Sequence, residues 1–97
     1  STTEAESRVG EKVRIAGMRQ TFRRIRTKAK QTMAVLTLED LEGSLQILIS
    51  PYLYRQNHLA LQEIGPFIIE GVIERDSERQ NIKMNAEKIV LLNNTNR

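Results

Sequence analysis

Two segments with alternating apolar side chains meet at a turn in MAVLTLEDLEGSLQILISP, residues 33–51. A period of two is typical of half-buried β-strands. Gly43 supplies the conformational freedom that a turn between them needs. We therefore predict an antiparallel hairpin of strands 33–39 and 44–50, stopped by Pro51, which cannot donate to a ladder. The apolar residues expected on the core face are Ala34, Leu36, Leu38, Leu45, Ile47 and Ile49.

The segments on either side complete a pattern of five strands and one helix. Gly17 and Gly71 interrupt alternating segments, which is typical of bends or bulges. Five strands with a helix between the third and fourth predict an all-β OB-fold, a five-stranded, partly open Greek-key barrel. An SH3-like barrel and a small α+β domain are the alternatives. The flanking elements expected are a strand at 12–26, a helix at 52–63, a strand at 67–75, a hairpin loop at 76–80 and a strand at 81–92.

The expected helix begins just after Pro51, a residue that suits a first helical turn. Leu53, Ala60 and Ile64 share one face at helical spacing. Gly65-Pro66 ends the helix. We expect this helix to cover one end of the barrel.

The length of 97 residues fits one small domain, expected at 9–92, with a disordered tail or linker at 1–8 and a polar tail at 93–97. The absence of cysteine excludes disulfides, thiolate metal sites and cysteine nucleophiles. With His58 as the one histidine, a zinc site of several imidazoles is excluded. No apolar run approaches the roughly 20 residues of a membrane span, and no secretory signal is visible. We expect a cytoplasmic module without cofactor, membrane contact or small-molecule substrate.

The formal net charge of +3 conceals an uneven distribution. Residues 1–30 hold nine basic and three acidic residues, whereas residues 31–97 hold six basic and nine acidic ones. Solvated surfaces usually mix both signs, so a cationic segment without acids favours contact with a polyanion, although a solvated basic loop is the alternative. The basic residues of this segment are Arg19, Arg23, Arg24, Arg26, Lys28 and Lys30.

The outer face of the second and third strands, flanked by the loops 1–2 and 4–5, is the usual ligand surface of an OB-fold. The cationic segment falls at one side of this face and Arg79, with Lys83, at the other. Lysine and arginine there would bind phosphates and make binding salt-dependent. The side chains expected on the face itself are Met33, Val35, Thr37 and Gln46. They cannot stack on bases as rings do, so we expect weak, sequence-tolerant binding of nucleic acid that is dominated by phosphate contacts.

Nothing in the sequence favours an enzyme. Glu39, Asp40 and Glu42 form an acidic cluster, but they lack the alternating ligand spacing of a calcium loop. We interpret the cluster as a turn capped by Asp40. The glycines are scattered and form no phosphate-binding loop. We therefore expect no catalytic and no metal-binding residue.

Several short motifs resemble one family. They are Val13–Met18, Arg23–Lys28, Met33-Ala34, Thr37–Asp40, Gly43 and Pro51-Tyr52. Together they resemble the OB-fold domain near the C-terminal end of the bacterial DNA polymerase III α subunit, over residues 9–92. Where that family usually has Thr-Lys-Lys-Gly, this chain has Thr27-Lys28-Ala29-Lys30, and its third strand ends in Ile49-Ser50 rather than in valine or phenylalanine.

The resemblance implies a non-catalytic module that holds single-stranded template through the loop 1–2, in a parent polymerase whose active site lies in other domains. Two further functions stay open. An RNA or tRNA reader is one, because synthetase OB domains have a similar second strand, although they usually place a stacking aromatic where this chain has Val35. The other is a structural domain that docks other domains or subunits of a polymerase assembly.

Overall fold

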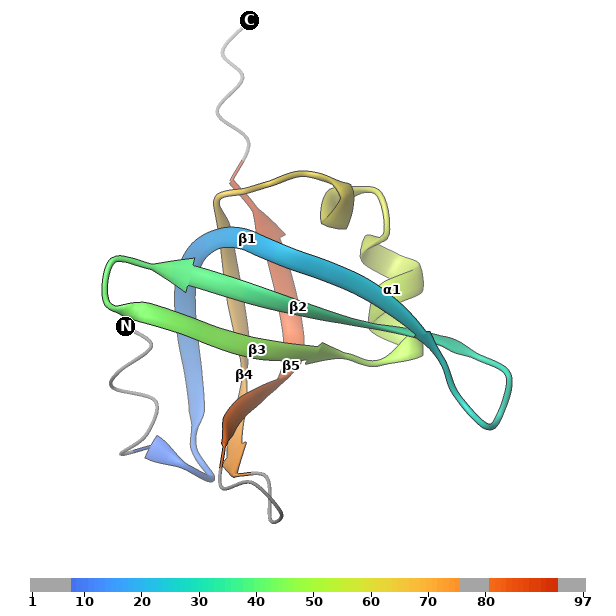
Figure 1. The fold of residues 1–97 in the computed structure, drawn as a ribbon, viewed down its shortest axis with the longest axis horizontal. Coiled ribbons are helices and arrows are strands. Elements are labelled where there is room, and N and C mark those ends of the chain that lie inside the picture. The colour runs from blue at the N-terminus through green and yellow to red at the C-terminus, as the bar shows by residue number, and fades with distance from the viewer. Residues whose placement is uncertain (1–7, 76–80, 93–97) are drawn as a thin grey trace, which may run out of the picture.

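The computed structural model describes residues 8–75 and 81–92. Figure 1 shows five strands wound into a small barrel, with the helical segment beside one end. The predicted order of strands and helix is confirmed. The elements are β1 (Lys12–Arg26), β2 (Thr32–Asp40), β3 (Gly43–Ile49), α1 (Pro51–Asn57), the 3-10 turn η2 (Ala60–Gln62), β4 (Phe67–Arg75) and β5 (Ile82–Leu91). No helix in the described ranges is long and apolar enough to cross a membrane.

The barrel is closed rather than partly open. The strands follow the order β1-β2-β3-β5-β4, and β4 pairs with β1 again. All neighbours are antiparallel except β3 and β5, which run parallel over Gln46–Leu48 and Lys83–Asn85. This short parallel pairing closes the barrel. The sequence pattern did not predict it, because alternation of side chains carries no information about which strands pair.

The first strand changes partner at Gly17, where a bend was predicted. Up to Gly17, β1 pairs with β4, and from Met18 onward it pairs with β2. A Cβ atom on Gly17 would lie 2.6 Å from the carbonyl oxygen of Glu39. Only glycine therefore lets the two strands approach so closely where β1 bends away from β4. Gly71, the second predicted bend, coincides with a register shift between β4 and β5.

The core is filled by alternating residues of all five strands, and the apolar residues that the hairpin pattern predicted on its core face are all buried. Fully buried side chains include Leu36, Leu38, Ile47, Ile49, Phe67, Ile69, Ile73 and Met84. Leu53 of α1 and Leu61 of η2 join this cluster from the end of the barrel that the helical segment covers. The helical segment thus plugs the barrel with Leu53, as expected, and with Leu61 in place of Ile64.

The observed helix is shorter than the predicted one. α1 ends at Asn57, and η2 then places Leu61 in the core, whereas Ile64 is 60% exposed. Ser50 accepts a hydrogen bond from Leu53 N and caps the start. Asn57 has low helix propensity, and its side chain donates to the Leu53 carbonyl. The chain therefore leaves the helix one turn after Leu53.

Candidate nucleic-acid interface

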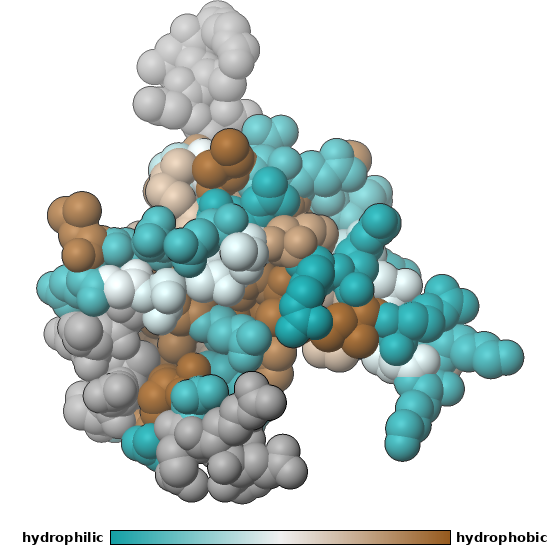
Figure 2. Space-filling view, viewed as in Figure 1, coloured by the Kyte–Doolittle hydropathy of each residue, from teal (hydrophilic) through white to brown (hydrophobic). Residues whose placement is uncertain are grey.

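The second half of β1 and the start of β2 form a hairpin that projects from the barrel. Beyond Gly17, β1 has no pairing with β4, and β3 pairs with β2 only from Ala34 onward. Figure 1 shows this end of the hairpin reaching past α1. Figure 2 shows hydrophilic side chains gathered over it. Five of the six expected cations lie on this projection.

A β-bulge at Gln20 determines which way each arginine points. Arg19 pairs with Leu38 and Thr21 with Thr37, so Gln20 is an extra residue on β1. Thr21 and Thr37 share a hydrogen bond of 2.9 Å between their hydroxyls and lie on the outer face. Because side chains alternate along a strand, Arg23 also lies on the outer face, whereas Arg24 lies on the opposite face. The cations therefore occupy two faces of the hairpin and not one rim.

The inner face of the hairpin carries three residues in a row, Phe22, Arg24 and Arg26, which pair in register with Leu36, Ala34 and Thr32. Phe22 packs against the core. Arg19 belongs to the same side and donates from Nη1 to the Leu61 carbonyl at 3.1 Å. Arg19 therefore lies beside the helical segment and away from the outer face where it was expected to act.

A tight turn of Thr27–Gln31 forms the tip of the hairpin. Lys30 N donates to the Thr27 carbonyl, and Gln31 N donates to the Thr27 hydroxyl. Lys30 has a φ of +62°, in the left-handed region that glycine adopts most easily. This is the position where the resembling family has glycine. Lys28 and Lys30 are both exposed at the tip.

Replacing Lys30 by glycine is expected to stabilise the fold relative to replacing it by alanine. Both changes remove the same charge, but only glycine takes a positive φ without steric cost, a difference of about 1 kcal/mol. Urea unfolding of the two variants measures it. Equal midpoints would show that the turn is not held in this conformation in solution.

The outer face of β2 and β3 offers fewer side chains to a nucleic-acid ligand than expected. Gln46 is exposed, while Met33 and Thr37 are half-buried. Val35 is only 5% exposed, because it lies in register between Arg23 and Leu48, so it cannot offer its side chain to a base in this conformation. Lys83 forms an ion pair of 3.6 Å with Glu74. Arg79 lies outside the described residues.

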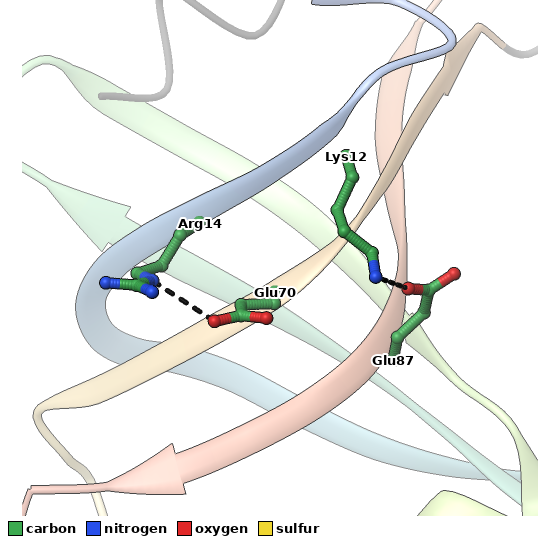
Figure 3. A network of polar contacts seen from close by, with 4 residues as sticks. All are labelled: Lys12, Arg14, Glu70 and Glu87. Atoms are coloured by element: carbon green, nitrogen blue, oxygen red, sulfur yellow. Dashed lines mark hydrogen bonds and ion pairs between the residues drawn. The ribbon is translucent and has the colours of Figure 1, made fainter.

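The ion pairs distinguish the two halves of β1. Arg14 pairs with Glu70 of the neighbouring strand β4, and Lys12 pairs with Glu87 of β5 (Figure 3). The hydrogen bond and charge of Glu87 raise the pKa of Lys12 above its usual value. In contrast, within the described part of the chain no ion pair involves the six cations from Arg19 to Lys30. Their charge is therefore available to a ligand.

The acidic cluster forms the predicted turn. The Asp40 carboxylate accepts hydrogen bonds from Glu42 N at 2.8 Å and from Gly43 N at 3.1 Å. An aspartate that caps its own turn in this way is a common arrangement. The predicted capping of this turn by Asp40 is thus confirmed.

Known proteins share this architecture and part of this sequence. No family model matches the chain. The asparaginyl-tRNA synthetase from Pyrococcus horikoshii contains a similar fold, with a TM-score of 0.69 and 21% identity, over 90% of this chain and 20% of that one. This chain is an OB-fold domain. In sequence it resembles the DNA polymerase III α subunit of Halalkalibacterium halodurans, with 29% identity over 80 residues.

The similarity to the polymerase subunit covers 82% of the chain but only 7% of the relative. The OB-fold domain thus corresponds to a small part of a long protein. Its resemblance to the polymerase family, noted above from the motifs in β1, β2 and the turn, is confirmed. The similarity to the synthetase shows a shared fold and nothing further.

Sequence reasoning missed two residues beside the cations. Tyr54 packs against the core and also lines a groove with Phe22 and Arg24. His58, the one histidine, lies in the same groove. About 30 residues separate them from the arginines, and no local pattern indicates that the fold brings them together.

Proposed function

We propose that this OB-fold domain binds single-stranded DNA as a non-catalytic module, mainly through the phosphates. The observation that carries the proposal is the cluster of cations from Arg19 to Lys30, which makes no ion pair among the described residues. Neutralising phosphates with such side chains releases counterions and supplies sequence-independent affinity. The projecting hairpin gives a strand access to these side chains from both faces.

The similarity to a DNA polymerase III α subunit supports DNA as the ligand. In a parent of this kind the domain would position the template strand of a replicative polymerase in the cytoplasm, at the nucleoid, and catalysis would lie in other domains. The domain's own contribution would be local, because it holds the strand at the hairpin and lets it run along the outer face.

Phosphate contacts dominate in this proposal because the outer face offers no ring for stacking. Met33 and Thr37 present partial surface, and Gln46 presents an amide. These groups pack against a base or sugar and give little sequence preference. The dissociation constant is therefore expected in the micromolar range or weaker, on the order of 10⁻⁶ to 10⁻⁴ M, as for other sequence-independent binding.

Titrating the labelled domain with a dT oligonucleotide by NMR tests the proposal. Four to six phosphate contacts on a single strand give a salt slope of about −3 to −4, so raising salt from about 50 to 200 mM should weaken binding roughly 50- to 300-fold. The shifts should fall on the hairpin tip, on Arg23 and on the outer residues Thr37 and Gln46.

Competition with RNA distinguishes the ligands. The DNA assignment predicts that dT displaces a structured RNA of equal charge, and the reverse order would identify an RNA reader. If neither nucleic acid shifts any resonance, the domain is a docking module for protein, and the proposed function is wrong.

A further inference from the structure

A groove lies between the second half of β1 and the helical segment. Its lining includes Arg19, Phe22, Arg23 and Arg24 from β1, with Tyr54 and His58 from the other side. Its volume of about 540 Å³ falls within the range of small-ligand sites, roughly 300–1,000 Å³. None of the lining residues is acidic. Of the β1 residues that line the groove, Arg19, Phe22 and Arg24 belong to the inner face of the hairpin and Arg23 to the outer face, whereas no residue of β2 or β3 lines it.

Arg19 is fixed in this groove before any ligand arrives. Its Nη1 donates to the Leu61 carbonyl at 3.1 Å, and its guanidinium carbon lies 5.5 Å from the centre of the Phe22 ring. A guanidinium carries five N–H donors in a rigid fork, so donors remain for an anion. Since the side chain is already ordered, a ligand loses little entropy in binding to it. Arg24 adds a second guanidinium on the same face.

The wall of the groove opposite β1 carries the aromatic rings of Tyr54 and His58. Tyr54 is half-buried against the core, and its ring contacts that of His58 at a centroid distance of 6.4 Å and an angle of 56°. His58 Nδ1 lies 3.2 Å from the Arg55 carbonyl oxygen, which fixes the position of that ring. Aromatic walls of this kind favour a flat partner, such as a nucleobase. The groove thus combines two guanidiniums for an anion with rings for a base.

We propose that this groove binds one nucleotide unit, with its phosphate on Arg19 and Arg24 and its base against Tyr54 and His58. The proposal deepens the proposed function, because it rests on nucleic acid as the ligand and adds a stacking contact that the outer face lacks. The bulge at Gln20 makes it possible, since it directs Arg24 to the same side of β1 as Arg19. A bound strand would then touch both faces of the hairpin.

Short probes test the groove apart from the outer face. Thymidine 5′-monophosphate and the dinucleotide TpT are too small to span both surfaces. Inorganic phosphate carries only the anion, and thymidine carries only the base and sugar. We expect both nucleotide probes to shift the resonances of Arg19, Phe22, Tyr54 and His58, and the better of them to bind at least about tenfold tighter than phosphate or thymidine. A preference for the monophosphate indicates a free or terminal nucleotide, and a preference for TpT indicates a unit within a strand.

Three variants assign the contacts. Arg24→Gln and Tyr54→Leu should each weaken the better nucleotide probe about tenfold, since they remove one charge and one ring. Arg55→Gln is the matched control, because it removes the same charge from an exposed residue of α1 that does not line the groove, and it should change affinity less than twofold. Unchanged amide spectra outside the groove show that each variant is folded.

The proposal is overturned if phosphate binds as tightly as the nucleotides, if the shifts fall outside the groove, or if Arg24→Gln and Arg55→Gln behave alike. An acidic peptide that displaces the probes at lower concentration would also overturn it. These outcomes are separate from failure of the proposed function, in which a long dT oligonucleotide leaves the hairpin tip and Gln46 unshifted.

Discussion

Replacing Arg23, Arg24, Arg26 and Lys28 together by glutamine is expected to weaken binding of a dT oligonucleotide by two to three orders of magnitude at about 0.1 M salt. Each phosphate contact on a single strand contributes about 0.7 to the salt slope, which amounts to about 0.7 log unit at this salt concentration. The salt slope itself should fall by about 3. Fluorescence anisotropy at several salt concentrations measures both quantities. The fold should persist, because all four side chains are exposed.

A control with the same change in net charge separates local contact from overall attraction. Arg8, Lys12, Arg14 and Lys88 are also exposed, and the first three are paired with glutamates. Replacing these four by glutamine should weaken binding less than about fivefold, since screening limits the effect of distant charges. Similar losses in both variants would mean that the hairpin is not the site of contact.

Replacing Gly71 by alanine should destabilise the domain by about 3 kcal/mol or more. A Cβ atom there would collide with the carbonyl oxygen of Asn85 and lie 2.9 Å from the Cα atom of Ala86. Both are backbone atoms of the adjacent strand, so no side chain can turn away, and β4 and β5 must separate. A domain of this size has only about 5–15 kcal/mol of stability, so the loss is a large part of it. Urea unfolding followed by circular dichroism measures the change.

Gly10→Ala is the matched control for this experiment. It has the same effect on the entropy of the unfolded chain, and no atom lies within 4 Å of the added Cβ atom. Its cost is the positive φ of +88°, about 1 kcal/mol. If the two alanine variants lost equal stability, the close approach of β4 and β5 would not exist in solution.

Much of the fold follows from the sequence because its apolar residues alternate clearly. The bounds of β1 and β4 agree with the structure to the residue. The helix was overextended because Leu53, Ala60 and Ile64 fit a helical period, although the chain turns after Asn57 and buries Leu61 instead. Closure between β3 and β5 was missed, since it depends on pairing of strands that are distant in the chain.

The position of the cations along the chain was predictable, but their orientation was not. Arg19, Gln20 and Thr21 are all polar, so hydropathy gives no sign of the extra residue that reverses the alternation. The burial of Val35 depends on its neighbours across two strands, which a single strand's pattern does not contain. The groove beside Tyr54 requires the folded contact between β1 and the helical segment.

The parallel pairing of β3 with β5 is the shortest seam between strands in the described barrel. It extends only over Gln46–Leu48, whereas β4 and β5 pair from Phe67 to Arg75. Local opening of a protein begins where few backbone hydrogen bonds must break, so the amides of this seam should exchange with solvent before those of the other seams. A strand of DNA that crosses the outer face from β2 over β3 to β5 would tie the two sides of the seam together. The bound DNA would then oppose separation of β3 from β5. The slowing of amide exchange at this seam would report how much of the DNA strand is bound.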